Sequence, residues 1–270
     1  MQTVGKNAES FQVMRLSKGV SRTEPEDLIG EEPLLIRIDG KPYSVVMRTP
    51  GEEVFHAAGF CLGEGIADSA DDFDTIGYCK DLDPNVIEVR LKPQRREKVE
   101  ELLGRRTFVS QTSCGICGKE LVKDLQQILT PAEDGFQVAI EKIFESIDQL
   151  YQNQKLYRKT RGSHAAIIFD KQLEMIAFAE DVGRHNALDK AVGNALINRK
   201  LSDARILVLS SRISYELVQK AARAQLPIMI SKSRPTALAA KMGQALNMTL
   251  ACVDKTSDLM VFCGQNRIIF

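Results

Sequence analysis

The chain has 270 residues, enough for one large or two modest domains, each with its own hydrophobic core. Basic and acidic residues balance at 36 each, so a general attraction to nucleic acid or to an anionic membrane is not expected. Residues 1–20 lack the apolar core of a signal peptide, and no apolar run approaches the roughly 20 residues that span a bilayer. The sequence therefore predicts a cytoplasmic protein.

The first part of the chain is predicted to form a tail and a small domain. Residues 1–24 show no sustained hydrophobic period, which predicts a tail. Over residues 25–132, two strands, a helix and two more strands predict an α+β domain of β-grasp-like type, which also includes a Cys-x-x-Cys segment. Its elements are strands at 34–39 and 43–49 around an Asp-Gly-Lys-Pro turn, a helix after Pro50, and strands at 75–79 and 86–91.

The second part, residues 133–270, is predicted to form a larger and more regular domain. A linker with Pro131 and Gly135 separates it from the first, because both residues interrupt helical and strand periods. A hairpin followed by alternating helices and strands predicts a three-layer α/β/α domain with a mixed sheet. The elements are helices at 140–153, 184–197, 213–224 and from Pro235 to about 246, and strands at 164–170, 173–179, 205–210, 227–231, 248–253 and 259–262.

Polar loops follow three of the predicted strands in the second domain, each directly before a helix. In an open α/β sheet, ligands bind beyond the carboxyl ends of the strands, at helix N-termini. Cations, hydroxyls and free backbone N–H groups would converge there, which suits a phosphate-rich ligand. The alternative is that the polar side chains only cap helices. The residues assigned to this pocket are Arg184, His185, Ser211, Arg212 and Ser231, with Lys232 and Arg234 as further cations.

Two of the six cysteines point to sulfur chemistry. Cys114 and Cys117 form a Cys-Gly-Ile-Cys motif directly before a helix predicted over residues 120–129. Unpaired N–H groups and the helix dipole favour thiolates there, and the neighbouring glycines leave room for a partner. In a reducing compartment the remaining cysteines are predicted to be small core thiols rather than disulfides. These are Cys61, Cys79, Cys252 and Cys263.

A zinc site is the main alternative use of Cys114 and Cys117. Structural zinc takes four Cys or His ligands, and a second closely spaced pair is missing from the sequence. His185 has the chemistry of a general base or a metal ligand, but a single histidine near a helix start is more often structural. The same holds for His56 and His164. No metal site is predicted, and a mononuclear zinc shared between two chains stays as the alternative.

At these motifs the sequence resembles the FdhD family. Three blocks carry the resemblance, in the family's order across about residues 30–255. They are Thr-Ser-Cys-Gly-Ile-Cys-Gly-Lys at 112–119, Glu-Asp-Val-Gly-Arg-His-Asn-Ala-Leu-Asp-Lys at 180–190, and Ser-Ser-Arg-Ile-Ser at 210–214. Gly-Ser-His-Ala-Ala at 162–166 and the Pro235-Thr236 pair also fit. An eleven-residue string together with an ordered Cys-x-x-Cys block is far more specific than a single motif.

The resemblance implies a formate dehydrogenase accessory sulfurtransferase. Members of the family take sulfur from a cysteine desulfurase as a cysteine persulfide. They pass it to the bis-(molybdopterin guanine dinucleotide) molybdenum cofactor before that cofactor enters formate dehydrogenase. In the family the first cysteine carries the persulfide, which implies Cys114 as the carrier and Cys117 as its assistant. GDP-like nucleotides would be partial mimics of the cofactor.

The resemblance also implies a fold similar to cytidine deaminase for the second domain, in agreement with the hairpin and the alternating helices and strands. Zinc deaminases need His-x-Glu at one helix start and Pro-Cys-x-x-Cys at the next. The matching positions read His185-Asn186-Ala187 and Ser-Ser-Arg-Ile-Ser at 210–214. Because both ligand sets are missing, neither zinc nor deaminase chemistry is expected.

One stretch near the C-terminus departs from the family. The family shows an aromatic-x-Arg-Gly-x-Arg stretch, assigned to cofactor binding, shortly after a Thr-Leu pair. In this chain a continuation without gaps from Thr249-Leu250 lacks the aromatic and the second arginine. A shifted substitute could lie within residues 262–267. The residues at the aligned positions, which are carried over as cofactor contacts, are Val253, Asp254, Lys255, Thr256, Ser257 and Asp258.

Two rival functions belong to other classes. A thiol-disulfide oxidoreductase would cycle Cys114 and Cys117 through a disulfide, but the motif lies between two domains rather than after the first strand of a βαβ unit. A non-catalytic chaperone would only hold the molybdenum cofactor. The predicted partners are a cysteine desulfurase, formate dehydrogenase and the molybdenum cofactor, with no nucleic acid and no membrane. Because the cofactor has two guanine nucleotide halves, a symmetric homodimer is expected, with one half in each copy.

Overall fold

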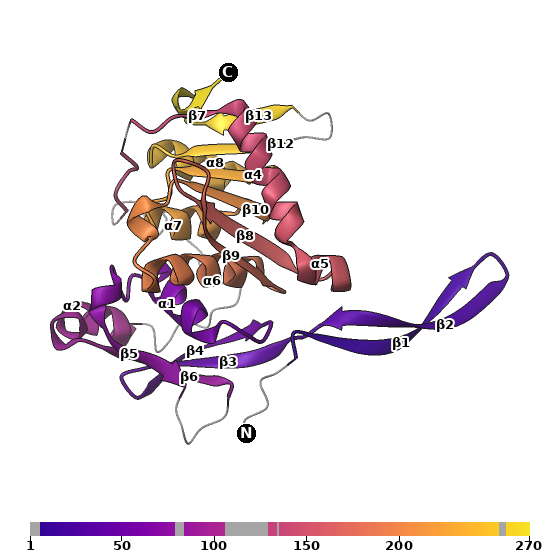
Figure 1. Cartoon of the computed structure of the whole chain (residues 1–270). Helices are drawn as coiled ribbons and strands as arrows, with labels where there is room; N and C mark the ends of the chain where they lie inside the picture. Colours follow the sequence, from indigo (N-terminus) through magenta and orange to yellow (C-terminus); the bar gives the residue numbers. More distant parts are fainter. Residues whose placement is uncertain (1–5, 79–83, 106–128, 134, 254–257) are drawn as a thin grey trace.

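The computed structural model describes residues 6–78, 84–105, 129–133, 135–253 and 258–270. Within them, a six-stranded and a four-stranded sheet with helices between them form a body, from which a two-stranded arm extends (Figure 1). No helix in these ranges is both long and apolar enough to cross a bilayer. The helices are α1 (Glu53–Gly63), α2 (Pro93–Arg105), α4 (Ile140–Asn153), α5 (Lys155–Thr160), α6 (Arg184–Ile197), α7 (Tyr215–Arg223) and α8 (Ala237–Ala245).

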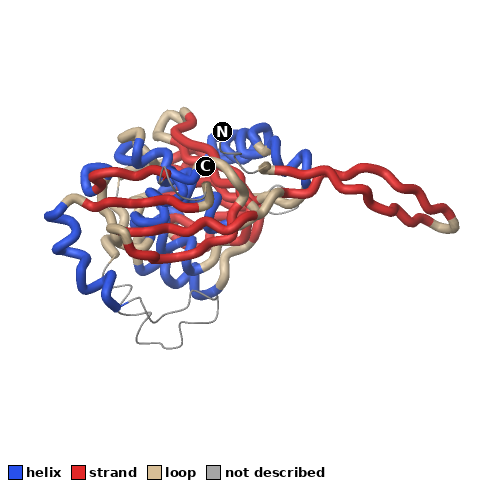
Figure 2. Tube along the Cα trace, turned by 90° about the horizontal axis from the view of Figure 1, so that it is seen from below, coloured by secondary structure: helices blue, strands red, loops and turns tan. Residues whose placement is uncertain are grey.

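The arm consists of β1 (Ala8–Ser17) and β2 (Val20–Ile29), which pair antiparallel along their whole length. Figures 1 and 2 show from two directions that the arm stands away from the body. The prediction that residues 1–24 form a tail is therefore wrong for residues 8–24. Most side chains of the arm are exposed, so no buried face imposes the regular alternation by which a strand is recognised.

The four-stranded sheet has the order β4-β3-β6-β5, with β3 and β6 parallel at its centre. Alternate residues such as Leu34 and Ile36 face inward and are fully buried beneath α1. The strand, helix and strand order agrees with the prediction for the first domain, and its likeness to a β-grasp stays a prediction. The strands are β3 (Glu32–Ile38), β4 (Lys41–Arg48), β5 (Phe73–Tyr78) and β6 (Val86–Leu91).

The six-stranded sheet has the order β13-β12-β11-β10-β8-β9 and is mixed. Its central strands β10, β11 and β12 are parallel, whereas β8 and β13 run antiparallel to their neighbours. The predicted α/β class with a mixed sheet is confirmed. The strands are β8 (His164–Phe169), β9 (Met175–Asp181), β10 (Ile206–Arg212), β11 (Ile228–Ser233), β12 (Thr249–Val253) and β13 (Leu259–Cys263).

Helices cover both faces of this sheet. Leu207 and Leu209 belong to the core beneath α6, α7 and α8, whereas Ile206 and Val208 belong to a second core beneath α4. Both sides of the central strands are thus apolar, as is typical of parallel strands that are buried on both faces. The domain is built of three layers, and its similarity to cytidine deaminase stays a prediction.

Two glycines allow α1 and α6 to cross in backbone contact. A Cβ atom on Gly59 would lie 1.9 Å from the carbonyl oxygen of Asp189, and one on Gly193 would lie 1.8 Å from that of Phe55. Because α1 covers the four-stranded sheet and α6 covers the six-stranded one, a single hydrophobic core joins the two parts. The domain boundary near residue 132 stays a prediction.

Several short or polar elements were not predicted. They are α2, α5 and the parallel pair of β7 (Val138–Ala139) with β14 (Ile268–Ile269), in which a periodic apolar pattern is short or absent. In α8, Thr236 is the N-cap and its side chain accepts a hydrogen bond from Ala239 N at 3.1 Å. Pro235 therefore precedes the cap rather than lying in the first turn, where it was expected. The helix predicted over 120–129 lies outside the described residues, apart from residue 129.

Candidate functional site

Four strands end at one edge of the six-stranded sheet. β10, β11 and β12 are parallel, and β9 runs in the same direction because β9 and β10 both pair antiparallel with β8. Their last residues are Asp181, Arg212, Ser233 and Val253. The three loops that the sequence assigned to a phosphate-rich ligand therefore follow this one edge, as the rule for open α/β sheets predicts.

Arg184 and Arg212 of the predicted pocket lie on the side of this edge that α6 and α7 cover. Leu209 faces that side, and Ser231 is its neighbour on β11. A register shift after Leu209 pairs Arg212 with Ser233, so the exposed Arg212 lies on the same side as Leu209. Arg184 is the first residue of α6 and is half-buried. Positive charge is thus available where the strands end.

The serines at this edge hydrogen-bond to the backbone. Ser231 donates its hydroxyl to the carbonyl oxygen of Ser211 and accepts a hydrogen bond from Ser233 N at 3.0 Å. Ser211, which is also buried, donates to the carbonyl oxygen of Arg212 at 3.2 Å. These hydroxyls hold the ends of the strands together. Ser211 and Ser231 thus have a structural role, which is the kind of role that the alternative to a phosphate pocket gives to the polar residues of these loops.

His185 lies in the first turn of α6, near α7. Its Nε2 atom is 3.4 Å from Ser214 Oγ and 3.9 Å from Glu216 Oε2. Burial, together with the positive charges of Arg184 and Lys220, lowers the pKa of His185 to about 4. The imidazole is therefore neutral at pH 7 and can donate or accept a hydrogen bond, whereas the charge at this edge is carried by arginine.

Lys232 does not join the other cations. Its Nζ atom lies 3.6 Å from the centre of the Tyr151 ring, on α4. Successive residues of a strand point to opposite faces, so Lys232 is on the α4 side of the sheet while Ser231 is on the other. The expectation that four cations converge is therefore wrong for Lys232, which makes a cation–π contact instead.

A buried ion pair fixes the loop that carries Arg184. The carboxylate of Asp181 is fully buried and lies 2.7 Å from Lys190 Nζ. It also accepts hydrogen bonds from Thr49 N at 3.1 Å, Gly183 N at 2.8 Å and Asn186 Nδ2 at 2.9 Å. Thr49 lies between β4 and α1, so the N-terminal part of the chain holds the β9–α6 loop in place.

Sequence reasoning did not assign this role, although a signal was present. Asn186 and Lys190 are four residues apart, so both side chains lie on one face of α6 and can reach back to Asp181. All three belong to the eleven-residue string at 180–190. Thr49 carried no signal, because its contacts join distant parts of the chain. Its backbone N–H donates to Asp181, and its carbonyl oxygen accepts a hydrogen bond from Lys190 Nζ at 2.8 Å.

His56 is buried in α1 beside this network. Burial lowers the pKa of His56 well below its usual range, and the charges of Lys190, Lys220 and Arg48 act in the same direction. The Asn186 side chain lies nearby, but neither ring nitrogen makes a hydrogen bond of standard geometry. The folded protein therefore holds this imidazole neutral in a positively charged surrounding.

Acid is expected to destabilise the fold through His56. Below its ordinary pKa of 6.5 the unfolded chain binds a proton that the folded chain excludes, so stability falls with decreasing pH by up to about 1.4 kcal/mol per unit. Urea unfolding at pH 7.5 and pH 5.5 measures this loss. His56→Gln should lose less stability than the unchanged protein between the two values. His164→Asn, at a half-buried histidine whose pKa burial also lowers, should reduce the loss by a smaller amount. An equal loss in the His56→Gln and unchanged proteins would contradict this explanation.

The remaining predicted site residues lie at or beyond the limits of the described ranges. Val253 ends β12 and is half-buried, and Asp258 is exposed. Within the suggested substitute at 262–267, Arg267 is buried and donates to the carbonyl oxygen of Glu133 at 2.9 Å, so it supports packing. In the described ranges, no group of three His, Cys, Asp or Glu side chains could hold a metal. The predicted residues outside these ranges are Cys114, Cys117, Asp254, Lys255, Thr256 and Ser257.

Comparisons with known proteins match nearly the whole chain. The profile of the FdhD/NarQ family matches residues 29–269. A protein of Streptomyces coelicolor named sulfur carrier protein FdhD is 35% identical over 98% of this chain and 97% of its own length. The protein of that name from Mycobacterium tuberculosis is 36% identical over 95% of this chain and 96% of its own.

The fold is also found in a solved structure. A candidate formate dehydrogenase accessory protein from Desulfotalea psychrophila, known from a crystal structure, superposes with a TM-score of 0.78. The match covers 98% of this chain and 100% of the other at 21% sequence identity, which shows that the two share a fold. Together with the family profile and the relatives above 30% identity, these matches establish that the chain belongs to the FdhD/NarQ family.

Proposed function

We propose that this protein is a cytoplasmic sulfurtransferase that carries sulfur as a persulfide on Cys114. Its sulfur would come from a cysteine desulfurase and go to the bis-(molybdopterin guanine dinucleotide) molybdenum cofactor, which formate dehydrogenase needs for activity. The observation that supports this most is the Cys-Gly-Ile-Cys motif in a chain whose relatives are named sulfur carrier proteins.

The proposed relay uses two thiols, with Cys114 as the carrier and Cys117 as its assistant. The Cys114 thiolate attacks the terminal sulfur of the desulfurase persulfide, the S–S bond breaks, and the desulfurase cysteine leaves as a thiolate. The terminal sulfur on Cys114 is then the nucleophile toward the molybdenum centre of the substrate. When the Cys117 thiolate attacks the Sγ atom of Cys114, that terminal sulfur is released as sulfide to the metal. The resulting disulfide is reduced by a cellular dithiol.

The cofactor's guanine nucleotide halves are proposed to bind at the carboxyl edge of the six-stranded sheet. The exposed guanidinium of Arg212 and the helix start at Arg184 support contacts with phosphate oxygens, because charged donors and free helix N–H groups favour anions. Neutral His185 would complete the pocket, and the buried Ser211 and Ser231 would support it by holding the strand ends in place. The stretch 253–258 is proposed to contribute because it follows Thr249-Leu250 where the resembled family has its cofactor-binding stretch. With one half in each copy, a homodimer would hold the whole cofactor.

Losing Arg212 should weaken nucleotide binding. A charge-assisted hydrogen bond contributes about 1.5–3 kcal/mol, so Arg212→Ala is expected to bind GDP roughly tenfold to a hundredfold more weakly. Titration calorimetry with GDP measures this directly, on the full chain and without a desulfurase.

The matched control for this substitution is Lys232→Ala. It removes a cation whose ammonium group rests on the Tyr151 ring, on the other side of the sheet. Because that side faces α4 and not the proposed pocket, the control should bind GDP as the unchanged protein does. Equal affinity of the Arg212→Ala and unchanged proteins would mean that the loops at this edge only cap helices.

A further inference from the structure

The start of β8 lies at the same edge of the six-stranded sheet as the proposed nucleotide pocket. β8 runs antiparallel to β9 and β10, so its first residue, His164, lies where those two strands end. His164 is paired with Asp181, and residues directly opposite each other in an antiparallel pair share a face. Asp181 reaches Lys190 on α6, so His164 lies on the α6 side as well. A histidine that the predicted pocket did not include is thus placed on the pocket's side of the sheet.

Two imidazoles and two guanidinium groups therefore share this side of the edge. His185 follows Arg184 in the first turn of α6, and Arg212 ends β10 on the same side. The side chain of His185 is 35% exposed and His164 is half-buried, so neither is closed off from an incoming ligand. The four residues come from β8, α6 and β10, which the topology of the sheet brings together.

The positive charges at this edge keep both imidazoles neutral in the free protein at pH 7. Burial lowers the pKa of His164, and the charge of Arg184 acts in the same direction. Burial, Arg184 and Lys220 lower the pKa of His185 to about 4, and His164 contributes in the same direction. The charge that the free pocket offers to a ligand is therefore that of the arginines.

Two carboxylates face the imidazoles but do not protonate them. Asp181 lies beside His164 and is held in a buried ion pair with α6, and Glu216 on α7 lies beside His185. Both act to raise the pKa of their neighbouring histidine, yet each histidine pKa remains lowered. Glu180 is turned to the other face of the sheet, where its carboxylate accepts hydrogen bonds from the first turn of α5.

A phosphate bound among these groups would change that balance. An opposite charge within roughly 4–6 Å favours the protonated form of an imidazole. A protonated imidazole donates from both ring nitrogens and forms charge-assisted hydrogen bonds with phosphate oxygens. Because His164 and His185 repel each other when both are charged, about one proton is expected for the pair.

We propose that His164 is a further ligand-binding residue of this pocket, and that His164 and His185 together take up a proton from solvent when the phosphates of a nucleotide bind. The inference rests on the proposed nucleotide pocket. A guanidinium keeps its charge at all times, whereas the imidazoles supply charge only while the ligand is present. The protein thus avoids crowding four positive charges at this edge when the pocket is empty.

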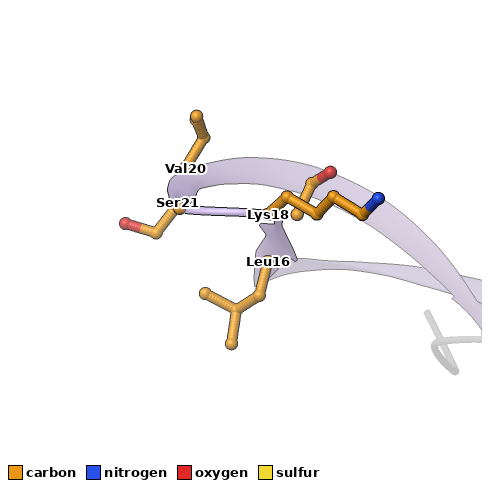
Figure 3. Close-up of a pocket in the computed structure, with 6 residues that line it drawn as sticks. Leu16, Lys18, Val20 and Ser21 are labelled. Atoms are coloured by element: carbon orange, nitrogen blue, oxygen red, sulfur yellow. The ribbon is translucent and has the colours of Figure 1, made fainter.

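The hollow at the tip of the arm does not offer this combination of groups. It is a turn lined by residues 16–21, among which Lys18 is the single ionisable side chain. Figure 3 shows Leu16 and Val20 pointing to opposite sides of the tip, so the lining side chains do not converge on a ligand. The phosphates of a nucleotide are therefore expected at the sheet edge and not at the arm.

The test is titration calorimetry of the full chain with GDP at pH 7.0, in two buffers that differ in their enthalpy of ionisation. The difference between the two heats gives the number of protons taken up per GDP bound. The unchanged protein should take up about 0.3–1 proton. His164→Asn and His185→Gln should each reduce this number at least about twofold. The double variant should show no uptake or a release, because arginines alone favour the fully ionised phosphate, whose last pKa is about 6.

His56→Gln, at the third histidine of the chain, is the matched control. His56 is fully buried in the core, so this variant should take up as many protons as the unchanged protein. Urea unfolding at pH 7.0 checks that each variant is folded. Proton NMR of the unchanged protein needs no folded variant: the ring signals of His164 and His185 should titrate at higher pH with GDP bound, and that of His56 should not.

The outcomes separate this inference from the proposed function. If GDP binds and Arg212→Ala weakens its binding, but the heat is the same in both buffers, the proton uptake is overturned while the nucleotide pocket stands. An uptake that His164→Asn leaves unchanged would remove His164 from the pocket. Absence of GDP binding by the unchanged protein would overturn both the pocket and the proton uptake.

Discussion

The Cys114→Ala variant is expected to restore no formate dehydrogenase activity to cells that lack their own copy of this protein. The proposed relay needs a thiolate at this position, and the buried cysteines offer no replacement. Cys61, Cys252 and Cys263 are buried thiols, and burial raises the pKa of Cys61 and of Cys263. A buried neutral thiol cannot attack a persulfide. The measurement is formate oxidation in extracts of cells that carry each variant.

Two comparisons make this prediction specific. Cys117→Ala should retain part of the activity if Cys117 only assists in releasing sulfide from Cys114. Cys263→Ala, which changes a buried thiol in β13, should retain the activity of the unchanged protein. Activity of the Cys114→Ala protein equal to that of the unchanged protein would show that this cysteine is not the carrier.

Gly193→Ala is expected to cost about 3 kcal/mol or more of the free energy of unfolding, because it inserts a methyl group into a contact between two helix backbones. The added carbon would lie 1.8 Å from the carbonyl oxygen of Phe55, so α1 and α6 would have to move apart. That movement would also disturb the buried bonds by which Thr49 holds Asp181. Chemical denaturation monitored by circular dichroism measures the loss.

The control for this substitution is Gly77→Ala in β5. A Cβ atom on Gly77 meets no other atom within 4 Å, so the same chemical change should leave the free energy of unfolding nearly unaltered. Similar unfolding curves for the Gly193→Ala and unchanged proteins would show that the two helices tolerate separation and that the glycine contact is not what sets their distance.

The parts of the fold that sequence predicts well are those with a buried face. The helix at 184–197 has the predicted bounds because its apolar residues repeat along one side, and the buried strand at β10 is a continuous apolar run. The loops of the candidate site were expected at one edge because parallel strands end together. The arm could not be predicted in this way, since neither of its faces is buried within the chain along its outer part.

Details of the site depend on contacts that no local pattern reveals. The direction of Lys232 follows from its register on β11, and the side on which Arg212 lies follows from a register shift in β10. The pairing of Asp181 with Lys190 depends on Thr49, which lies 132 positions from Asp181 in the sequence. Such long-range contacts decide which polar residues are structural and which remain available to a ligand.

The most direct test of the proposed function is the mass of the peptide that contains Cys114 after the protein is incubated with a cysteine desulfurase and cysteine. The proposal predicts a gain of one sulfur atom on Cys114, which a thiol reductant removes. An internal disulfide between Cys114 and Cys117 without added sulfur would indicate an oxidoreductase instead. An unchanged mass would indicate a chaperone that only holds the cofactor, and either result would contradict the persulfide relay.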